Sequence, residues 1–337
     1  MARFVAQRFM WLVVVLFVVS AITFVLMRIV PGGPFATERG IPDSILRALE
    51  EKYSLNSTLP EQYLKWIGDI IFPRITGEEY RPSSVNDYLI NIRLDVFRAD
   101  TDFRWMNFGP SLRIRSRTVN NIFEENLPIS LQLGLAALMV AMAIGIPAGI
   151  IAALNRNTIY DYAGMGVAII GVSIPVIIMG PILQYVFGVQ WRLLPVSGWG
   201  NPQHVIMPAF ALGFAQSALL ARLTRAALLQ VMNEDYIRTA RAKGLSERMV
   251  ILFHALKNSL IPVVTVLGPL FAALLTGTFV TETIFGIPGM GRFFVTSVTN
   301  RDYPVIMGTI LLYAGFLVLA NMVVDITYAW LDPRIRY

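Results

Sequence analysis

The sequence predicts an all-α polytopic membrane protein with six transmembrane helices and an extracytoplasmic insert between the first and the second. Apolar residues make up 55% of the chain and charged residues only 15%, whereas soluble domains carry roughly 25% charged residues. The apolar residues are also gathered into six runs, each close to the roughly 20 residues that a membrane-crossing helix needs. A soluble protein could not bury this much apolar surface, so we expect a bilayer as its solvent.

The first of these runs lies near the N-terminus. Arg3 and Arg8 precede an uncharged run over 9–27. A secretory signal peptide also has a basic start and an apolar middle. Here, however, the run continues past Arg28 to Val30, and no small-x-small cleavage site is evident. We therefore interpret residues 1–30 as a cytoplasmic N-terminus and an uncleaved first transmembrane helix.

Residues 31–127 differ from the rest of the chain. They mix charges of both signs with several prolines, and no run is long enough to span a membrane. We interpret this segment as an extracytoplasmic domain. Short amphipathic helices are predicted over 44–53 and 60–72, and an amphipathic lead-in helix over 113–126. The basic residues of the lead-in are expected on a solvated or interfacial face, with ligand contact as the alternative.

Five further spans are predicted within 128–330. They run over 128–154, 163–187, 205–229, 260–280 and 305–330, and their connectors are 155–161, 188–204, the charged loop 230–259, and 281–304. With six spans, the tail 331–337 returns to the side on which the chain began.

The distribution of Arg and Lys predicts the orientation of these spans. Short connectors on one side carry only Arg192, Arg292 and Arg301. The other side carries the following basic residues: Arg3, Arg8, Arg156, Arg222, Arg225, Arg238, Arg241, Lys243, Arg248, Lys257, Arg334 and Arg336. The positive-inside rule therefore places both termini and the 230–259 loop in the cytoplasm, and the long insert is not counted because long polar domains translocate largely regardless of charge.

Glycine and proline interrupt several predicted spans, at Gly145-Ile146-Pro147, Ser173-Ile174-Pro175, Gly180-Pro181 and Gly268-Pro269. Such residues suit helices that bend around a translocation path, but they equally suit close helix packing through small residues. Polar residues within or near spans are Gln184, Gln216, Glu282, Asn321 and Asp325. Functional and purely hydrogen-bonded roles both remain open for them.

No pattern of an enzyme or a metal site is found. The chain has no cysteine and two histidines, His204 and His254, and no stretch fits the phosphate-binding pattern G-x-x-x-x-G-K-[ST]. The segment 286–291 is rich in glycine but lacks the strand–turn–helix setting of a nucleotide loop. The net charge of +6 does not indicate nucleic acid, because the basic residues flank apolar spans or lie in a mixed-charge loop.

The most charged run in the apolar two-thirds of the chain is 234–262, and it predicts two helices with a break between them. On the first helix, Ile237 shares one face with Tyr236 and Ala240, opposite a face with Asp235, Arg238 and Arg241. Glu234 is spaced for an ion pair with Arg238. Gly244 is expected as a left-handed C-cap and Ser246 as the cap of the second helix.

The second helix is expected to bury an apolar stripe. The stripe consists of Leu245, Met249, Leu252, Phe253, Leu256 and Leu260, with Arg248, His254 and Lys257 on the wetter side.

This run resembles the cytoplasmic EAA loop of ABC importer permeases, in the version of the dipeptide and oligopeptide permease family. The matching segments are 235–247 (DYIRTARAKGLSE) and 254–258 (HALKN), with shorter matches at 194–198, 221–225, 288–292 and 331–336. The likeness covers the chain from about residue 126 to the end, plus the first helix. Arg238 stands where many permeases have the first Glu, and the Ile-x-Leu-Pro ending is missing at its usual spacing. These departures favour the peptide branch over the sugar branch.

The resemblance implies a type I ABC importer permease fold in which the helix around 234–244 docks in a groove of an ATPase subunit. The ATPase-coupling residues would then be Glu234, Asp235, Tyr236, Arg238, Thr239, Ala240, Arg241, Ala242, Lys243 and Gly244. The alternative is a basic amphipathic helix that lies on anionic lipid.

The function implied by the resemblance is that of a permease subunit in the prokaryotic cytoplasmic membrane. It would form half of the path for di- or oligopeptides, and oligosaccharides, glutathione or nickel are alternative cargoes. Expected partners are a second related permease, two ATP-binding subunits or domains that hold ATP and Mg²⁺, and an extracytoplasmic solute-binding protein facing 31–127 and 188–204. A secondary transporter is a less favoured alternative, because charged residues near span centres are not evident, and a membrane scaffold is a third. No substrate-binding residues are indicated.

Overall fold

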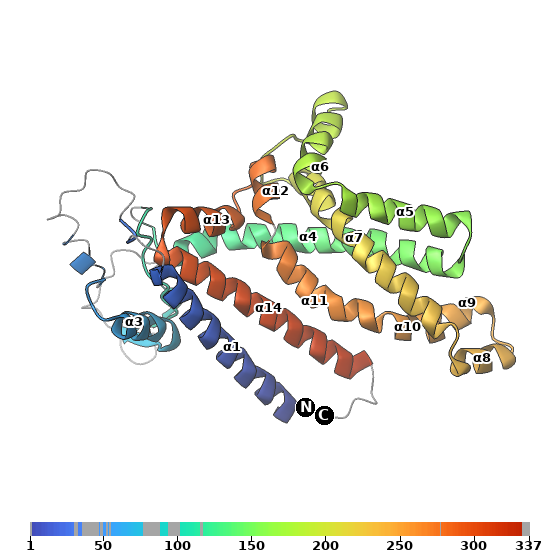
Figure 1. Ribbon diagram of the computed structural model, residues 1–337, viewed down its shortest axis with the longest axis horizontal. Helices are drawn as coiled ribbons and strands as arrows, with labels where there is room; N and C mark the ends of the chain where they lie inside the picture. The colour runs from blue at the N-terminus through green and yellow to red at the C-terminus, as the bar shows by residue number, and fades with distance from the viewer. Residues whose placement is uncertain are drawn as a thin grey trace. The chain divides into compact units, whose positions relative to one another are not determined.

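The computed structural model describes residues 2–29, 33–35, 47, 50–51, 53, 55–76, 88–93, 102–114, 117–276 and 278–331. Helices dominate these ranges (Figure 1). The chain forms two compact units: the first comprises Met1–Leu12, Ile129–Gly291 and Gly315–Tyr337, and the second Val13–Pro128 and Arg292–Ala314. Most of the predicted helix 44–53 and of the C-terminal match 331–336 lies outside the described residues.

The helix that begins the chain, α1, covers Ala2–Ile29, and the insert contains α3 (Leu59–Ile71), close to the predicted 60–72. The later helices are α4 (Val119–Leu154), α5 (Ile159–Ser173), α6 (Val176–Leu183), α7 (Gln203–Val231), α8 (Asp235–Ala242), α9 (Glu247–Met249), α10 (Leu256–Ser259), α11 (Ile261–Thr276), α12 (Thr278–Phe285), α13 (Gly291–Asn300) and α14 (Tyr303–Leu331). Two π-helices, Gln184–Gln190 and Val250–Ala255, follow α6 and α9.

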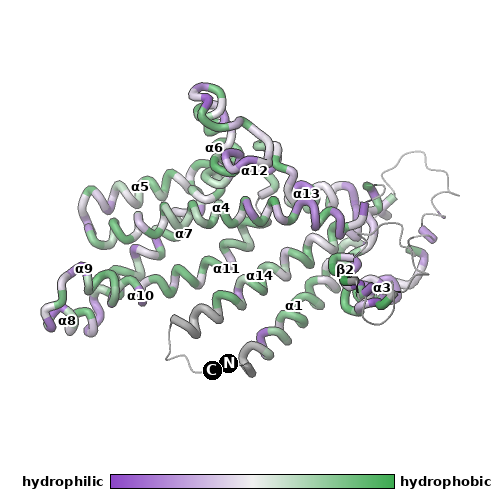
Figure 2. Tube along the Cα trace, turned by 180° about the vertical axis from the view of Figure 1, so that it is seen from behind, coloured by the Kyte–Doolittle hydropathy of each residue, from purple (hydrophilic) through white to green (hydrophobic). Residues whose placement is uncertain are grey.

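Among the described residues, four helices are long and apolar enough to cross a membrane, namely α1 from Ala6, α4, α7, and α14 up to Val324. Two bent pairs also qualify: α5 with Val176–Gln190, bent by 100°, and Glu247–Ser259 with Ile261–Leu275, bent by 47°. If each bent pair is one span, the total is six, as the sequence predicts. Figure 2 shows the largely apolar colouring of these helices.

The break between α5 and α6 lies at the predicted Ser173-Ile174-Pro175. Ile174 is extended, with φ −98° and ψ 109°, because a following proline disfavours the helical conformation of the residue before it. The other predicted interruptions do not end a helix: Gly145-Ile146-Pro147 lies inside α4, Gly180-Pro181 inside α6 and Gly268-Pro269 inside α11.

Glycines instead allow α4 and α7 to approach closely in the first unit. A Cβ atom on Gly145 would lie 2.5 Å from the carbonyl oxygen of Ser217, and one on Gly149 would lie 2.5 Å from that of Ala221. From the other helix, a Cβ atom on Gly213 would lie 2.3 Å from the carbonyl oxygen of Ala137. At Gly145 the structure therefore supports helix packing through small residues. The core beside this contact includes Leu133, Leu220, Leu274 and Phe285.

The second unit departs from the all-helical prediction. It contains a small antiparallel sheet of β1 (Arg74–Thr76), β2 (Ile90–Arg93) and β3 (Asp102–Trp105), in the order β1-β3-β2. Ile90 is paired with Trp105, and Arg74 with Arg104. Strands of three or four residues carry too little alternation to stand out in a sequence.

The predicted lead-in helix 113–126 starts later than expected, at Val119. The backbone N–H groups of Arg113 and Ile114 both donate to Ser111 Oγ, over 3.2 and 2.8 Å. This polar turn holds the chain out of a helix. From Val119 the helix runs into the second span without a break.

Candidate functional site

Helix α8, at the start of the charged loop, is a short helix seated on a small apolar core. Ile237 and Ala240 are buried, at 0% and 4% exposure, and pack in a cluster with Leu228 of α7 and with Val250 and Ala255 of the following π-helix. The predicted buried face is confirmed for Ile237 and Ala240. Tyr236, expected on that face, is 39% exposed.

The predicted coupling residues form one surface with a single exception. All of them except the buried Ala240 are exposed: Glu234, Asp235, Tyr236, Arg238, Thr239, Arg241, Ala242, Lys243 and Gly244. In Figure 2 this part of the chain is hydrophilic against the apolar helices beside it. Ala240 therefore packs α8 against its neighbours, as Ile237 does. Ile237 was not among the predicted coupling residues.

The turn after α8 has the geometry that the sequence predicts. Gly244 has a φ of +79°, the left-handed region that a glycine enters without penalty. Its N–H donates to Arg241 O over 2.9 Å, and the N–H of Leu245 donates to Ala240 O over 3.4 Å. A Cβ atom on Gly244 would meet nothing within 4 Å, so the constraint there is the backbone conformation rather than space.

Ion pairs in the loop differ from the prediction. Arg238 pairs with Asp235 at 3.4 Å rather than with Glu234, and both side chains are strongly exposed, so this pair contributes little. Arg241 instead bridges the turn to Glu247, with contacts of 2.6 and 3.1 Å. The carboxylate of Glu247 raises the pKa of the Arg241 guanidinium. Ser246 occupies the cap position, but its side chain makes no capping bond.

The predicted apolar stripe of the second helix is confirmed for Leu245, Leu256 and Leu260, which pack against buried clusters, and is wrong for its middle part. Met249, Leu252 and Phe253 are 46%, 59% and 68% exposed, while Val250 and Ala255 are fully buried. The residues from Val250 to Ala255 form a π-helix, whose i→i+5 turn is one residue longer than an α-helical turn. This wider turn brings residues five apart, Val250 and Ala255, onto the buried face and leaves Leu252 and Phe253 outside it.

A side-chain bond joins the two helical parts of the loop. The amide of Asn258 in α10 donates to the hydroxyl oxygen of Tyr236 in α8 over 2.8 Å. Together with the apolar cluster, this bond fastens α8 to the helices on both sides of the loop. Displacement of α8 would therefore be passed on to α7 and α10.

A buried ion pair near this loop was not anticipated. Asp161, 3% exposed, accepts from Arg225 Nε and Nη2, each over 2.7 Å. It also accepts from the N–H of Asn157 over 3.0 Å. The pair fixes the start of α5 to α7, and Arg225 belongs to the 221–225 match. Because Asp161 and Arg225 are 64 residues apart, no local pattern could have revealed the pair.

The glycine-rich segment 286–291 packs around the carboxylate of Glu282. Glu282, 1% exposed, accepts from Ser130 Oγ over 2.7 Å and from the N–H of Gly291 over 2.9 Å. A Cβ atom on Gly289 would lie 2.2 Å from a carboxylate oxygen of Glu282, so only glycine fits there. Gln184 likewise donates to the backbone, to Val196 O and Ile284 O. These two polar residues have structural hydrogen-bonded roles.

The described residues contain no group of three or more His, Asp or Glu side chains that could hold a metal ion. The side chain of Asp325 is outside the described part of the structure, although its backbone lies in α14.

Comparison with known proteins agrees with this architecture. The family model described as "binding-protein-dependent transport system inner membrane component" matches residues 145–337, and the corresponding N-terminal model matches 1–84. The whole α8 surface lies within the first match.

Relatives match over the full length. The chain is 41% identical over 336 residues to the dipeptide transport system permease protein DppB of Bacillus subtilis, covering 100% of this chain and 98% of DppB. It is 37% identical over 339 residues to the oligopeptide transport system permease protein OppB of Salmonella typhimurium, covering 100% of both.

A solved structure agrees in fold. The MetNI methionine ABC transporter in an inward facing conformation matches with a TM-score of 0.52 and 17% identity, over 63% of this chain and 96% of that one. The resemblance seen in the sequence is confirmed, and the chain belongs to the family of binding-protein-dependent transport system inner membrane components.

Proposed function

We propose that this chain is the membrane-spanning permease subunit of an ATP-driven ABC importer, and that it forms half of the path for di- or oligopeptides. The full-length similarity to a dipeptide and an oligopeptide permease protein supports the peptide class over oligosaccharides, glutathione or nickel. A second related permease, two ATP-binding subunits or domains and an extracytoplasmic solute-binding protein would complete the complex. ATP and Mg²⁺ would bind to the ATPase partners.

The observation that best supports a coupling role is the packing of α8 against the neighbouring helices. Its polar residues project from a helix whose apolar side, Ile237 and Ala240, is fully occupied by α7 and the π-helix. An ATPase groove that grips the exposed residues would thereby move the helices to which α8 is fastened. Alternating access requires such a rigid element to convert closure of one subunit into rocking of another.

Binding of α8 to anionic lipid is the weaker alternative. An interfacial helix inserts an apolar face into the membrane, but the apolar face of α8 is already buried within the protein. Its exposed residues also include the acidic Glu234 and Asp235 beside the basic ones. A protein groove with complementary charges fits this mixed surface better.

Secondary transport is disfavoured by where the charged groups lie. Within the described residues, Asp161 is in the first turn of α5 and is paired with Arg225, while Glu282 is held by Ser130 and Gly291. Neither is a charge placed at the centre of a span. We place α8 and both termini in the cytoplasm of a prokaryotic cell, from the Arg and Lys distribution, and we place residues 31–127 outside.

The test is purification of the tagged protein from its native membrane in mild detergent, with identification of its partners and transport assays in vesicles. Recovery of a second permease and an ATPase, together with ATP-dependent uptake of a radiolabelled di- or oligopeptide, is the expected result. Solute movement by the protein alone without ATP would overturn the proposal in favour of a secondary carrier. ATP-dependent uptake of another solute class would overturn only the assignment of cargo.

A further inference from the structure

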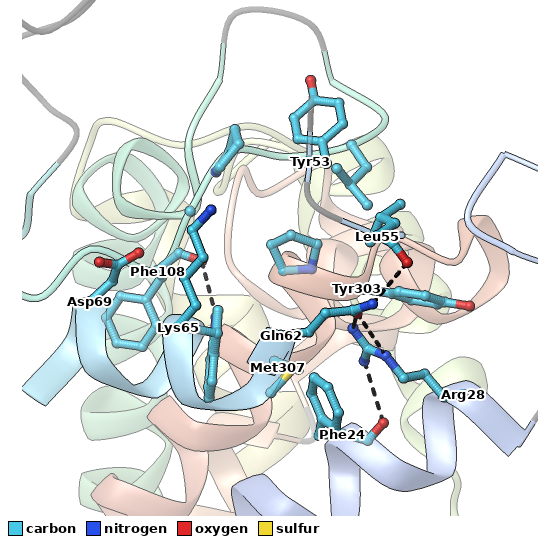
Figure 3. Close-up of a pocket in the computed structure, with 15 residues that line it drawn as sticks. Phe24, Arg28, Tyr53, Leu55, Gln62, Lys65, Asp69, Phe108, Tyr303 and Met307 are labelled. Atoms are coloured by element: carbon cyan, nitrogen blue, oxygen red, sulfur yellow. Dashed lines mark hydrogen bonds between the residues drawn. The ribbon is translucent and has the colours of Figure 1, made fainter. Parts of the chain in front are cut away.

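Helix α3, in the predicted extracytoplasmic insert, is fixed to α1 at two heights within the second unit. The hydroxyl of Tyr63 shares a hydrogen bond of 2.8 Å with Ser20 Oγ, and its ring packs edge-on against Phe24 with centroids 5.2 Å apart. The neighbouring Gln62 accepts from Arg28 Nη2 and Nε over 2.6 and 3.2 Å. Figure 3 shows Gln62 of α3 facing Arg28 and Phe24 of α1.

These contacts set the depth of α3. Residues 9–27 of α1 carry no charge, so Arg28 is the first charged residue at this end of a candidate span and its guanidinium marks the boundary between lipid and water. Ser20 lies eight residues earlier, which corresponds to about 12 Å along a helix. Because α3 contacts both levels, it lies at or below the level of Arg28, beside the apolar part of α1.

Aromatic residues mark the same level independently. A cavity of about 360 Å³ beside α3 is lined by Tyr53, Trp66 and Tyr303 as well as Phe24 and Arg28. Tyr and Trp gather where a membrane meets water, because each has an apolar body and a polar tip. The Arg28 guanidinium also lies 3.6 Å from the ring centroid of Phe24.

The outward side of α3 is apolar along one flank. Leu64 is 66% exposed and Ile71 50%, and being seven residues apart they share one face of the helix. On the other flank Glu61 and Lys65 are exposed. Water would be a poor solvent for the first flank, because exposed apolar area costs roughly 25 cal/mol per Å². A helix with this division suits the boundary between headgroups and acyl chains.

The exposed apolar residues of α3 resemble those on the surface of α1, which lies in a candidate membrane span. On α1, Ile22, Val25 and Leu26 are each more than half exposed within the candidate span. Because α3 is held beside α1 at the depth of Phe24 and Arg28, its exposed face should contact the same lipid as α1.

We propose that α3 is an interfacial helix embedded in the membrane leaflet at the Arg28 end of α1, with Leu64 and Ile71 among the acyl chains. Under the proposed orientation this is the extracytoplasmic leaflet. The insert is thus anchored to the membrane rather than held wholly in water.

This anchoring reaches the start of α4. Trp66 Nε1 donates to Phe108 O over 3.4 Å, and the N–H of Asn107 donates to Asp69 O over 3.0 Å. Helix α3 therefore connects α1 to the loop that precedes α4.

Because this chain has no cysteine, each introduced cysteine gives it one nitroxide label, and the complex assembled with the unlabelled parent chain supplies the background from partner subunits. The variants Leu64→Cys and Ile71→Cys test the apolar flank, Glu61→Cys the polar flank and Ile22→Cys the lipid-facing side of α1. The complete complex is reconstituted into phosphatidylcholine–phosphatidylglycerol vesicles. The collision rates of each label with O₂, which concentrates in lipid, and with a water-soluble nickel chelate are then measured by electron paramagnetic resonance.

We expect the ratio of O₂ to nickel collisions at position 64 to be close to that at position 22 and at least about fivefold above that at position 61. If Leu64→Cys does not assemble, the same result is expected at position 71. A ratio at 64 or 71 equal to that at 61 would place α3 in water and overturn the proposal. Exclusion of both reagents would equally overturn it, because a protein partner would then cover this flank.

Discussion

Replacing Ile237 with alanine should loosen the packing of α8 and uncouple transport from ATP hydrolysis without unfolding the protein. The side chain is fully buried between Leu228 and the π-helix, and truncation of a buried isoleucine to alanine costs about 2–5 kcal/mol. Helix α8 has 8 residues, fewer than the roughly 12–15 that an isolated helix needs in water. Its stability therefore comes mainly from this packing.

The effect should be local, because the lost contacts hold one loop rather than the main core. Even a loss of 2 kcal/mol raises the undocked population of α8 about 30-fold. In reconstituted complexes we expect peptide uptake to fall at least about tenfold, while membrane insertion is unchanged. Hydrogen exchange of the peptide that contains α8 should speed up, because local opening exposes its amides.

The matched control is Ile159→Ala, which removes the same atoms from a side chain that is 73% exposed. This variant should transport and exchange like the parent protein. Normal uptake by Ile237→Ala together with unchanged exchange in α8 would refute the reasoning. Faster exchange with normal uptake would show that α8 is seated as described but is not the coupling element.

Three further predictions concern other contacts. Gly244→Glu forces a residue with a side chain into the left-handed region at φ +79°, a strain of about 1–2 kcal/mol. Peptide uptake should then be lost while membrane insertion stays intact, whereas Gly244→Asn should retain much of the uptake. Equal uptake by both variants would contradict the role of the turn. Arg225→Met removes the guanidinium that pairs with the Asp161 carboxylate and leaves that charge without its counter-ion, so the melting temperature should fall. Adding Asp161→Asn should restore part of it, and unchanged melting of Arg225→Met would argue against the pair. Burial raises the pKa of Asp302 above 3.8 despite hydrogen bonds from Ser111 and Leu112, so the folded state binds this proton more tightly than the unfolded state. Protonation of Asp302 therefore stabilises the folded state below pH 3.8, and this stabilisation is lost as the pH rises through the folded pKa. Hydrogen exchange of the α13–α14 junction against pH should show this trend, and Asp302→Asn should abolish it.

The parts of the fold that follow from local composition were predictable. An uncharged run of sufficient length yields α1, α7 and α14 close to their predicted limits, because a bilayer selects for length and apolarity alone. The face of α8 and the left-handed Gly244 were equally accessible, since both depend on residues within one or two turns.

Errors arose where the backbone geometry changed or where partners came from distant segments. The π-helix from Val250 to Ala255 rotates Leu252 and Phe253 outward, and a periodicity that assumes 3.6 residues per turn cannot anticipate this. For Gly145-Ile146-Pro147 the sequence left a bend and close packing equally open, and the packing of Gly145 against Ser217 of α7 decides for the second.

The sequence by itself determined that this chain enters a membrane, which runs form its spans, and where the charged α8 begins and ends, because each depends on neighbouring residues. Only the tertiary structure decided which partner each buried polar group finds: Arg225 for Asp161 and Ser130 for Glu282. It also decided that Tyr63 reaches Ser20, which sets the depth of α3. A hydrogen bond requires proximity in space, and residues 43 positions apart acquire it only when the chain has folded.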